Sequence, residues 1–208
     1  MISSQSMNYL AAMRGTQQAL LDLCDNPQFA KEIMEIGTQI SIEKGIAFIK
    51  SGVDAIYIGD AFASSSIISP EQYKKFCFPL HCKATEVFHR YGVKVYLHIC
   101  GNSSPILEMM ADIGVDAIEP LASLGGVNLV DAKRRVGDRI CLMGGLNTLT
   151  LLHGKPENVE REAKECIEKA GRGEGYILGA GDAIPPNSPL SNIKAIVKAG
   201  IKYGNYKH

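Results

Sequence analysis

The sequence predicts an α/β fold in which a parallel sheet is built from repeated strand–helix units. Apolar residues recur at a helical period in some segments and form short continuous runs in others, and the two kinds of segment alternate along the chain. Serine–proline pairs, typical of capped helix starts, stand before three expected helices, at residues 69–70, 104–105 and 188–189. Because alternating strands and helices favour parallel pairing, we expect one sheet covered by helices.

The expected strands are short, apolar and mostly followed by glycine or an acidic residue. We predict strands at residues 55–58, 93–100, 116–119, 139–143 and 176–178, with residues 9–12 as a sixth candidate. We predict helices at residues 16–25, 28–50, 69–90 (bent at Pro79), 104–114, 129–136, 157–170 and 188–203. Five or six units are fewer than the eight of a (β/α)₈ barrel, so the pattern indicates an open sheet or part of a barrel. Since no linker interrupts residues 1–208, we expect a single domain.

The composition is that of an ordinary globular protein. The 208 residues are 46% hydrophobic and 21% charged, with a formal net charge of zero, which gives no reason to expect nucleic acid or an anionic membrane as a partner. We see no apolar run of about eighteen residues and no secretory signal. The six cysteines are scattered over expected helices and strands. This spacing favours a reducing cytoplasm over a disulfide scaffold.

A histidine and a cysteine two residues apart mark the end of the expected strand at 93–100. Side chains at i and i+2 of a strand leave by the same face, so His98 and Cys100 can converge on one point. Nitrogen and sulfur are ligands that zinc prefers, and α/β sheets place their chemistry at this end of the strands. A chance His-x-Cys is the structural alternative. His81 and Cys82, adjacent on an expected helix, point apart and are interpreted as surface or core residues.

Four further polar residues follow expected strands. Asp60, Glu119, Asn147 and Asp182 each stand at or just beyond the carboxyl end of a strand. If the strands are parallel neighbours, these side chains share one rim with the His-x-Cys pair. For each residue alone the structural alternative is a helix cap or a loop hydrogen bond. Together around a metal pair they indicate a functional site.

With these residues in place, the chain resembles the uroporphyrinogen decarboxylase superfamily and, more narrowly, its corrinoid-dependent methyltransferases of the methylcobamide:coenzyme M type. The strongest matches are Leu-His-Ile-Cys-Gly-Asn at 97–102, Pro-Ile-Leu at 105–107, and the segment 182–190 with Asn192 and Ile193. Weaker matches are residues 52–55 with 59–60, and 144–147. The resemblance covers nearly the whole chain and corresponds to about the carboxyl-terminal three fifths of a family member.

The resemblance implies a fold, a cofactor and a partner. It implies a TIM barrel of the uroporphyrinogen decarboxylase type, of which this chain holds five or six βα units. It implies zinc bound by His98, Cys100 and a residue beyond the last strand, where Asp182 stands in place of the family's cysteine. Glu119 could be a fourth ligand, and Glu119, Asp60 and Asn147 are the candidate catalytic residues. The activity implied is methyl transfer between methylcobalamin on a corrinoid protein and a small acceptor, most simply a thiol.

Two other functions remain open from the sequence. A metal-free decarboxylase like uroporphyrinogen decarboxylase would leave the His-x-Cys pair unexplained. A partial barrel could also be a non-catalytic subunit, because exposed sheet edges favour a homo-oligomer or a barrel-completing chain.

Overall fold

The computed structural model describes residues 2–205, over which strands and helices alternate. The packing of the Cα atoms divides the chain into two compact units. The first unit extends to Ile99 and includes Pro105–Ile118, and the second consists of Cys100–Ser104 and the residues from Glu119 onward. Single-domain organisation over residues 1–208 stays a prediction.

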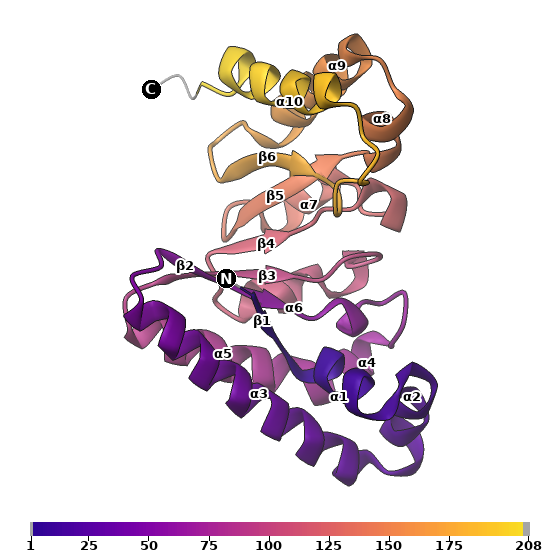
Figure 1. The fold of residues 1–208 in the computed structure, drawn as a ribbon, viewed down its shortest axis with the longest axis vertical. Helices are drawn as coiled ribbons and strands as arrows, with labels where there is room; N and C mark the ends of the chain where they lie inside the picture. Colours follow the sequence, from indigo (N-terminus) through magenta and orange to yellow (C-terminus); the bar gives the residue numbers. More distant parts are fainter. Residues whose placement is uncertain (1, 206–208) are drawn as a thin grey trace. The chain divides into compact units, whose positions relative to one another are not determined.

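The first unit contains parallel strands that are neighbours in chain order (Figure 1). Strand β2 pairs in parallel with β1 and with β3, and His98 at the end of β3 lies opposite Gly59. The elements up to β4 are β1 (Ile2–Ser4), α1 (Ser6–Arg14), α2 (Thr16–Asp25), α3 (Pro27–Lys50), β2 (Ala55–Gly59), η1 (Ala61–Ala63), α4 (Pro70–Gln72), η2 (Tyr73–Cys77), α5 (Phe78–Arg90), β3 (Lys94–His98), η3 (Ser104–Ile106), α6 (Leu107–Asp112) and β4 (Ala117–Glu119).

The two faces of strands β2 and β3 have different surroundings. Alternate residues on one face are fully buried, and helices α3 and α5 contact the strands. These buried residues are Ile56, Ile58, Val95 and Leu97. Tyr57, Tyr96 and His98 belong to the opposite face because side chains alternate along a strand. The hydrophobic pattern therefore buries the aliphatic residues under the helices and leaves His98 on the face away from them.

The second unit repeats the strand–helix pattern. Strand β5 pairs in parallel with β6, from Leu142 opposite Tyr176 to Leu146 opposite Ala180. The Tyr176 hydroxyl donates to the Gly144 carbonyl oxygen at 2.6 Å, which adds a side-chain bond to the strand pair. After β4 the elements are η4 (Ser123–Gly125), α7 (Leu129–Val136), β5 (Cys141–Leu146), α8 (Thr148–His153), α9 (Pro156–Ala170), β6 (Tyr176–Ala180) and α10 (Leu190–Tyr203).

Three strand predictions need correction. Residues 9–12 lie inside α1, and the remaining strand is β1 at Ile2–Ser4. Strand β3 ends at His98 rather than at residue 100. The strand expected at 139–143 begins later, because the N–H groups of Arg139 and Ile140 donate to the Val136 carbonyl at the end of α7. It continues to Leu146 through two glycines with positive φ, a conformation that glycine allows.

Two helix predictions also need correction. The helix expected at 69–90 is not one continuous α-helix, and the bend expected at Pro79 stays a prediction. It contains the π-helical turn η2, in which the Phe78 N–H donates to the Tyr73 carbonyl oxygen five residues back. This turn lies directly before Pro79, which has no N–H to donate. Ser69 caps its helix as expected. Ser188 does not: the cap position of α10 is Pro189, and no side chain caps the helix.

Six strands among the described residues, five of them in parallel pairs, agree with the predicted five or six βα units. All six cysteines are free. No helix in residues 2–205 is long and apolar enough to cross a membrane.

Candidate metal centre

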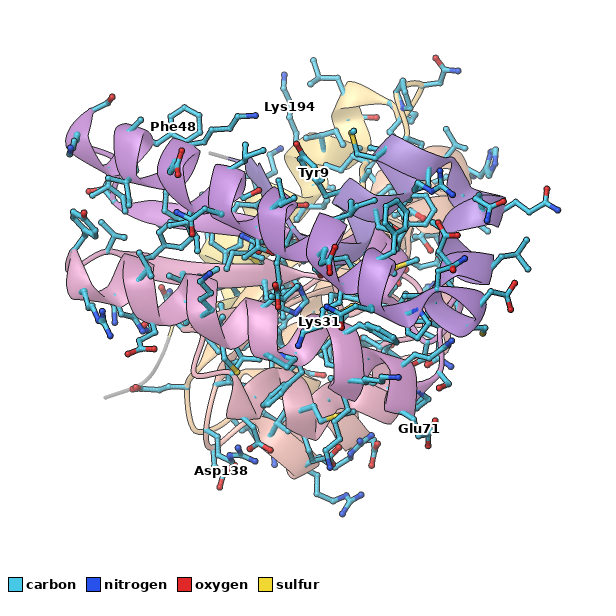
Figure 2. The ribbon with its side chains drawn as sticks, turned by 90° about the horizontal axis from the view of Figure 1, so that it is seen from below. Tyr9, Lys31, Phe48, Glu71, Asp138 and Lys194 are labelled. Atoms are coloured by element: carbon cyan, nitrogen blue, oxygen red, sulfur yellow. The ribbon has the colours of Figure 1, made fainter. Side chains whose placement is uncertain are left out.

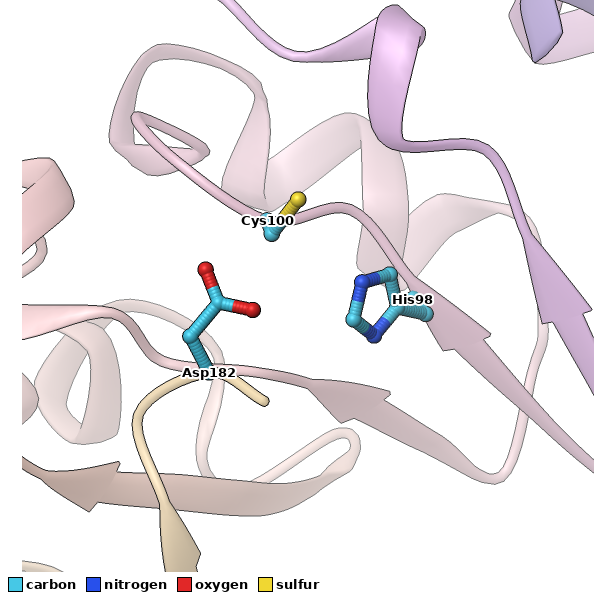
Figure 3. A group of neighbouring side chains, drawn as sticks. All are labelled: His98, Cys100 and Asp182. Carbon is cyan, nitrogen blue, oxygen red and sulfur yellow. The ribbon is translucent and has the colours of Figure 1, made fainter. Parts of the chain in front are cut away.

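Cys100 and Asp182 come together in the second unit (Figure 3). The Cys100 sulfur and a carboxylate oxygen of Asp182 lie within 4.8 Å of each other, although 82 positions separate them in the sequence. Ligand atoms that share one tetrahedral zinc are about 3.5 Å apart, as follows from bond lengths of about 2.0–2.3 Å. The two side chains therefore lie close to the spacing that a shared metal ion requires.

The loop that carries Asp182 is fixed by the end of strand β5. The Gly181 N–H donates to the Leu146 carbonyl oxygen at 2.6 Å, which continues the β5–β6 ladder by one bond past Ala180. Asp182 follows immediately and is exposed. Its Oδ1 accepts from the Ala183 N–H at 2.7 Å. This local bond orients the carboxylate group at the loop's start.

The loop that carries Cys100 makes a tight turn after β3. Gly101 has a φ of +78°, and the Ser103 N–H donates to its carbonyl oxygen at 3.1 Å. A Cβ atom on Gly125 would lie 2.3 Å from the same Gly101 oxygen. The loop can approach η4 only because position 125 has no side chain. Cys100 is half-buried at the start of this turn.

His98 is the last residue of β3, in the first unit. Its carbonyl oxygen accepts from the Asp60 N–H at 2.9 Å. Its imidazole packs against the Tyr57 ring, with 5.3 Å between ring centroids and 47° between the planes. One residue separates His98 from Cys100 in the sequence. The pairing of β3 with β2 and the contact with Tyr57 thus restrain the imidazole directly before the cysteine.

Asp60 belongs to a buried hydrogen-bond network and is not exposed at the rim formed by the strand ends. Its carboxylate accepts hydrogen bonds from the Ser6 hydroxyl, from the Met7 N–H at 3.2 Å and from the Asn8 N–H at 2.7 Å. His81 Nε2 lies 3.0 Å from Asp60 Oδ2, and the Tyr73 hydroxyl lies 3.2 Å from His81 Nδ1. Asp60 and His81 are fully buried. A catalytic role for Asp60 stays a prediction, and its contacts fit a positioning role.

The network includes residues that the sequence did not single out as functional. His81, interpreted as a surface or core residue, lies in the core. Burial raises the pKa of the Tyr73 hydroxyl well above its usual value. Burial first, and the nearby Asp60 carboxylate second, raise the pKa of the Cys77 thiol. Tyr73 and Cys77 are therefore neutral near pH 7. The π-helical turn that sets their positions has no signal in the sequence that we recognise.

Glu119 and Asn147 lie at strand ends as expected. Glu119 ends β4 and is half-buried, but it is not in the group of ligand atoms that includes those of Cys100 and Asp182. The Asn147 side chain caps α8, accepting from the Leu149 N–H at 2.8 Å. Its backbone N–H donates to Glu162 at 2.7 Å. Asn147 thus has the capping contact named as its structural alternative, and catalytic roles for both residues stay predictions.

Comparison with protein families gives a match over most of the chain. The family described as uroporphyrinogen decarboxylase (URO-D) matches residues 6–203. A methylcobamide:CoM methyltransferase of Methanosarcina barkeri is 32% identical over 174 residues, which are 83% of this chain and 49% of that protein. A uroporphyrinogen decarboxylase of Coxiella burnetii is 29% identical over 182 residues, 85% of this chain and 48% of that protein. The chain spans about half the length of these curated relatives.

A solved structure supports the same relationship. A methyltransferase from Methanosarcina mazei matches with a TM-score of 0.87 and 27% sequence identity, over 98% of this chain and 59% of that one. Together with the parallel strands in chain order, this match gives the chain the α/β fold of a TIM-type barrel, with six of the eight strands present among the described residues.

Proposed function

Since the chain belongs to the uroporphyrinogen decarboxylase family, we propose that it is a zinc-dependent methyltransferase. The methyl group would move between a corrinoid carried by a partner protein and a small acceptor, most simply a thiol. The observation that carries the proposal is the approach of the Cys100 sulfur and an Asp182 carboxylate oxygen to within 4.8 Å. Cys100 lies two residues after His98, whose imidazole is restrained by Tyr57. The relatives named as methyltransferases support the reaction class.

We propose that His98, Cys100 and Asp182 are the zinc ligands. They offer one nitrogen, one sulfur and one oxygen, all of which zinc accepts, and three protein ligands are typical of a catalytic site with an open position. A thiolate and a carboxylate together carry two negative charges, which balance Zn²⁺. The Tyr57 ring against the imidazole limits its rotation, so the protein side of the site is partly organised before metal binding.

When bound, zinc supplies a positive charge that lowers the pKa of a thiol placed at the open position. The acceptor thiol would lose its proton to a nearby base, for which Glu119 at the end of β4 is our candidate. The resulting thiolate sulfur forms a bond to the methyl carbon. The bond from that carbon to cobalt breaks, and its electron pair stays on the cobalt. In this proposal, the chain's own residues would hold the zinc, and Glu119 would take up one proton.

Methyl transfer from free methylcobalamin to a small thiol tests this function. We expect the zinc-loaded chain to convert methylcobalamin to the demethylated corrinoid, with a matching amount of methyl thioether, and Cys100→Ser to lose this activity. Cys141→Ser is the matched control, because Cys141 is half-buried in β5 and its pKa is raised by burial. Absence of thioether with the folded, zinc-loaded wild type would contradict the proposal, as would full activity of Cys100→Ser.

Decarboxylation is the second candidate, favoured by the similarity to the Coxiella burnetii uroporphyrinogen decarboxylase. It would require no zinc and no Cys100 thiol. Release of CO₂ from uroporphyrinogen that persists in Cys100→Ser and in the presence of a chelator would therefore support this reading over methyl transfer.

A further inference from the structure

The Cys100 loop, residues 100–104, is tied at its far end to helix α7 of the same unit. Arg135 Nη2 donates to the Ser104 carbonyl oxygen at 2.8 Å, and Arg135 Nη1 donates to the Ser104 hydroxyl at 3.2 Å. Both residues belong to the second unit, although 31 positions separate them in the sequence. One guanidinium group thus holds the backbone and the side chain of the residue at which the loop ends. We call these two hydrogen bonds the Ser104 clamp.

Arg135 is itself fixed on its helix. The Asp131 carboxylate, one turn earlier in α7, accepts from Arg135 Nη1 at 3.1 Å. Hydrogen bonds from Arg134 first and Arg135 second lower the pKa of Asp131, so this carboxylate is charged near pH 7. The Arg135 side chain is 20% exposed, whereas that of Arg134 is 74% exposed. Arg135 is therefore held within the protein at the point where it contacts Ser104.

The clamp acts on a loop whose other side lies directly against η4. The Gly101 carbonyl oxygen is so close to this turn that a Cβ atom on Gly125 would lie 2.3 Å from it. The Asn102 side chain accepts from the Ser104 N–H at 3.2 Å. The Ser103 hydroxyl is buried and has no hydrogen-bond partner among the described residues. Because an unpaired buried hydroxyl costs free energy, the other contacts of the loop, the clamp among them, impose its shape.

Small shifts of this loop would change the geometry of the candidate metal ligands. Cys100 begins the loop, four positions before Ser104, and its sulfur lies within 4.8 Å of an Asp182 carboxylate oxygen (Figure 3). Metal–ligand distances are held within about 0.2 Å of their ideal values, so a loop displaced by a fraction of an ångström binds the ion less tightly. Residues that orient metal ligands from outside typically change metal affinity by about 10–100-fold when they are replaced.

We propose that Arg135 is a positioning residue that holds the Cys100 loop in the shape that zinc binding requires. The inference rests on the proposed zinc site and adds a residue that acts on it through Ser104. The planar guanidinium group presents two nitrogens to the two Ser104 oxygens at once, which the single ammonium group of a lysine cannot reproduce in the same geometry.

Two measurements on Arg135→Gln test the proposal. The dissociation constant for zinc, from competition with a chromophoric chelator, should rise by about 10–100-fold. The rate at which iodoacetamide modifies Cys100 in the metal-free chain, followed by peptide mass spectrometry, should rise about threefold or more, because local opening exposes the half-buried thiol. Arg135→Lys, which keeps the charge and one donor group, should show a smaller change in both quantities. A loss of folding stability alone would change neither quantity in the folded chain.

Arg134→Gln is the matched control, because Arg134 is adjacent and bonds to the same Asp131 carboxylate from an exposed position. It should leave both quantities unchanged. An unchanged zinc affinity in Arg135→Gln beside a zinc-binding wild type would overturn the proposal, as would equal changes in Arg134→Gln. A wild type that binds no zinc would refute the proposed function instead. The modification rate then decides whether Arg135 positions the loop: a faster rate in Arg135→Gln than in Arg134→Gln supports it, and equal rates overturn it.

Discussion

The carboxylate of Asp60 joins three segments of the first unit. It accepts from the first N–H groups of α1, from the Ser6 hydroxyl and from His81 of α5, while its own N–H bonds to the last residue of β3. The first N–H groups of a helix have no partner within the helix, and a negative charge at that end is favourable. The Asp60 carboxylate therefore stabilises the first turn of α1, and the Asp60 N–H holds the backbone of His98.

Replacement of Asp60 by asparagine should destabilise the protein substantially. The amide cannot accept all four hydrogen bonds, and buried donors to a charged group are left unsatisfied, so we expect a loss of about 2–3 kcal/mol of unfolding free energy. Urea denaturation measures it. Asp138→Asn, at an exposed position (Figure 2), should change stability by less than about 0.5 kcal/mol. A loss that small in Asp60→Asn would refute the anchoring role.

A cysteine at position 182 should strengthen metal binding under our proposal. Asp182→Cys replaces a carboxylate by a thiolate at the same loop position, and thiolates are the softer ligands that zinc prefers. We expect the dissociation constant for zinc to fall by about tenfold or more, as measured by competition with a chromophoric chelator. An unchanged or weaker affinity would place Asp182 outside the metal site.

At the scale of residues, the sequence predicted contacts between residues that are close in the chain better than contacts between residues that are far apart in it. The two-residue spacing of His98 and Cys100 predicts their proximity, because the covalent chain enforces it. The position of Asp182 beyond the last expected strand placed it on the same rim as Cys100, and the resemblance to a family selected it from the other polar residues of that rim as a metal ligand. The pairing of Asp60 with His81 was not predicted, since it depends on how the π-helical turn sets the rotation of α5.

Helix α3 packs closely because two of its positions have no side chain. A Cβ atom on Gly37 would lie 2.2 Å from the Tyr9 ring of α1 (Figure 2), and one on Gly45 would lie 2.4 Å from the Phe88 ring of α5. Both distances are too short for real contacts. The glycines weaken the helix itself, by about 1 kcal/mol each relative to alanine, but they allow neighbouring helices to approach.

Two glycine-to-alanine substitutions should therefore change stability in opposite directions. Gly45→Ala must displace Phe88, which is fully buried, and we expect a net loss of about 1–3 kcal/mol. Gly200→Ala in α10 has its nearest contact at 3.6 Å, so helix propensity dominates, with a gain of about 0.5–1 kcal/mol. Denaturant unfolding of both variants checks the pair. The same sign of change in both would show that the packing around α3 is not as described.

An ion pair joins α1 to α2. Arg14 Nε lies 2.7 Å from Asp22 Oδ2, and hydrogen bonds from Arg14 and then Gln18 lower the pKa of Asp22. A carboxyl whose pKa is lowered by folding stabilises the folded state above its unfolded pKa, about 3.9, and this contribution is lost as the pH falls through the folded pKa.

The stability difference between wild type and Asp22→Asn should accordingly be constant near neutral pH and shrink below about pH 4. Urea titrations at several pH values measure it. A difference that grows on acidification would contradict the lowered pKa of Asp22.

At the scale of elements, periodicity was a reliable guide to the long helices and to the central strands. It was less reliable where tertiary contacts decide the outcome. Residues 9–12 look like a short strand but are helical, because Asp60 satisfies the N–H groups at the start of α1. The start of β5 is delayed by the hydrogen bonds that end α7.

At the scale of the whole molecule, the repeated strand–helix pattern was sufficient to predict a parallel α/β fold. The pattern did not distinguish an open sheet from part of a barrel, because each unit looks the same in either arrangement. The distinction comes from the match to a methyltransferase structure with a TM-score of 0.87. The metal ligands are expected at the carboxyl ends of β3 and β6, where TIM-type folds place their chemistry.

The most direct test of the proposed metal centre is the zinc content of the purified chain by elemental analysis, after metal loading under reducing conditions and removal of excess metal. We predict about one zinc per chain in the wild type and in Cys141→Ser, and loss of the zinc in His98→Ala, Cys100→Ser and Asp182→Ala. A folded wild type without zinc, or zinc retained in Cys100→Ser, would contradict the account.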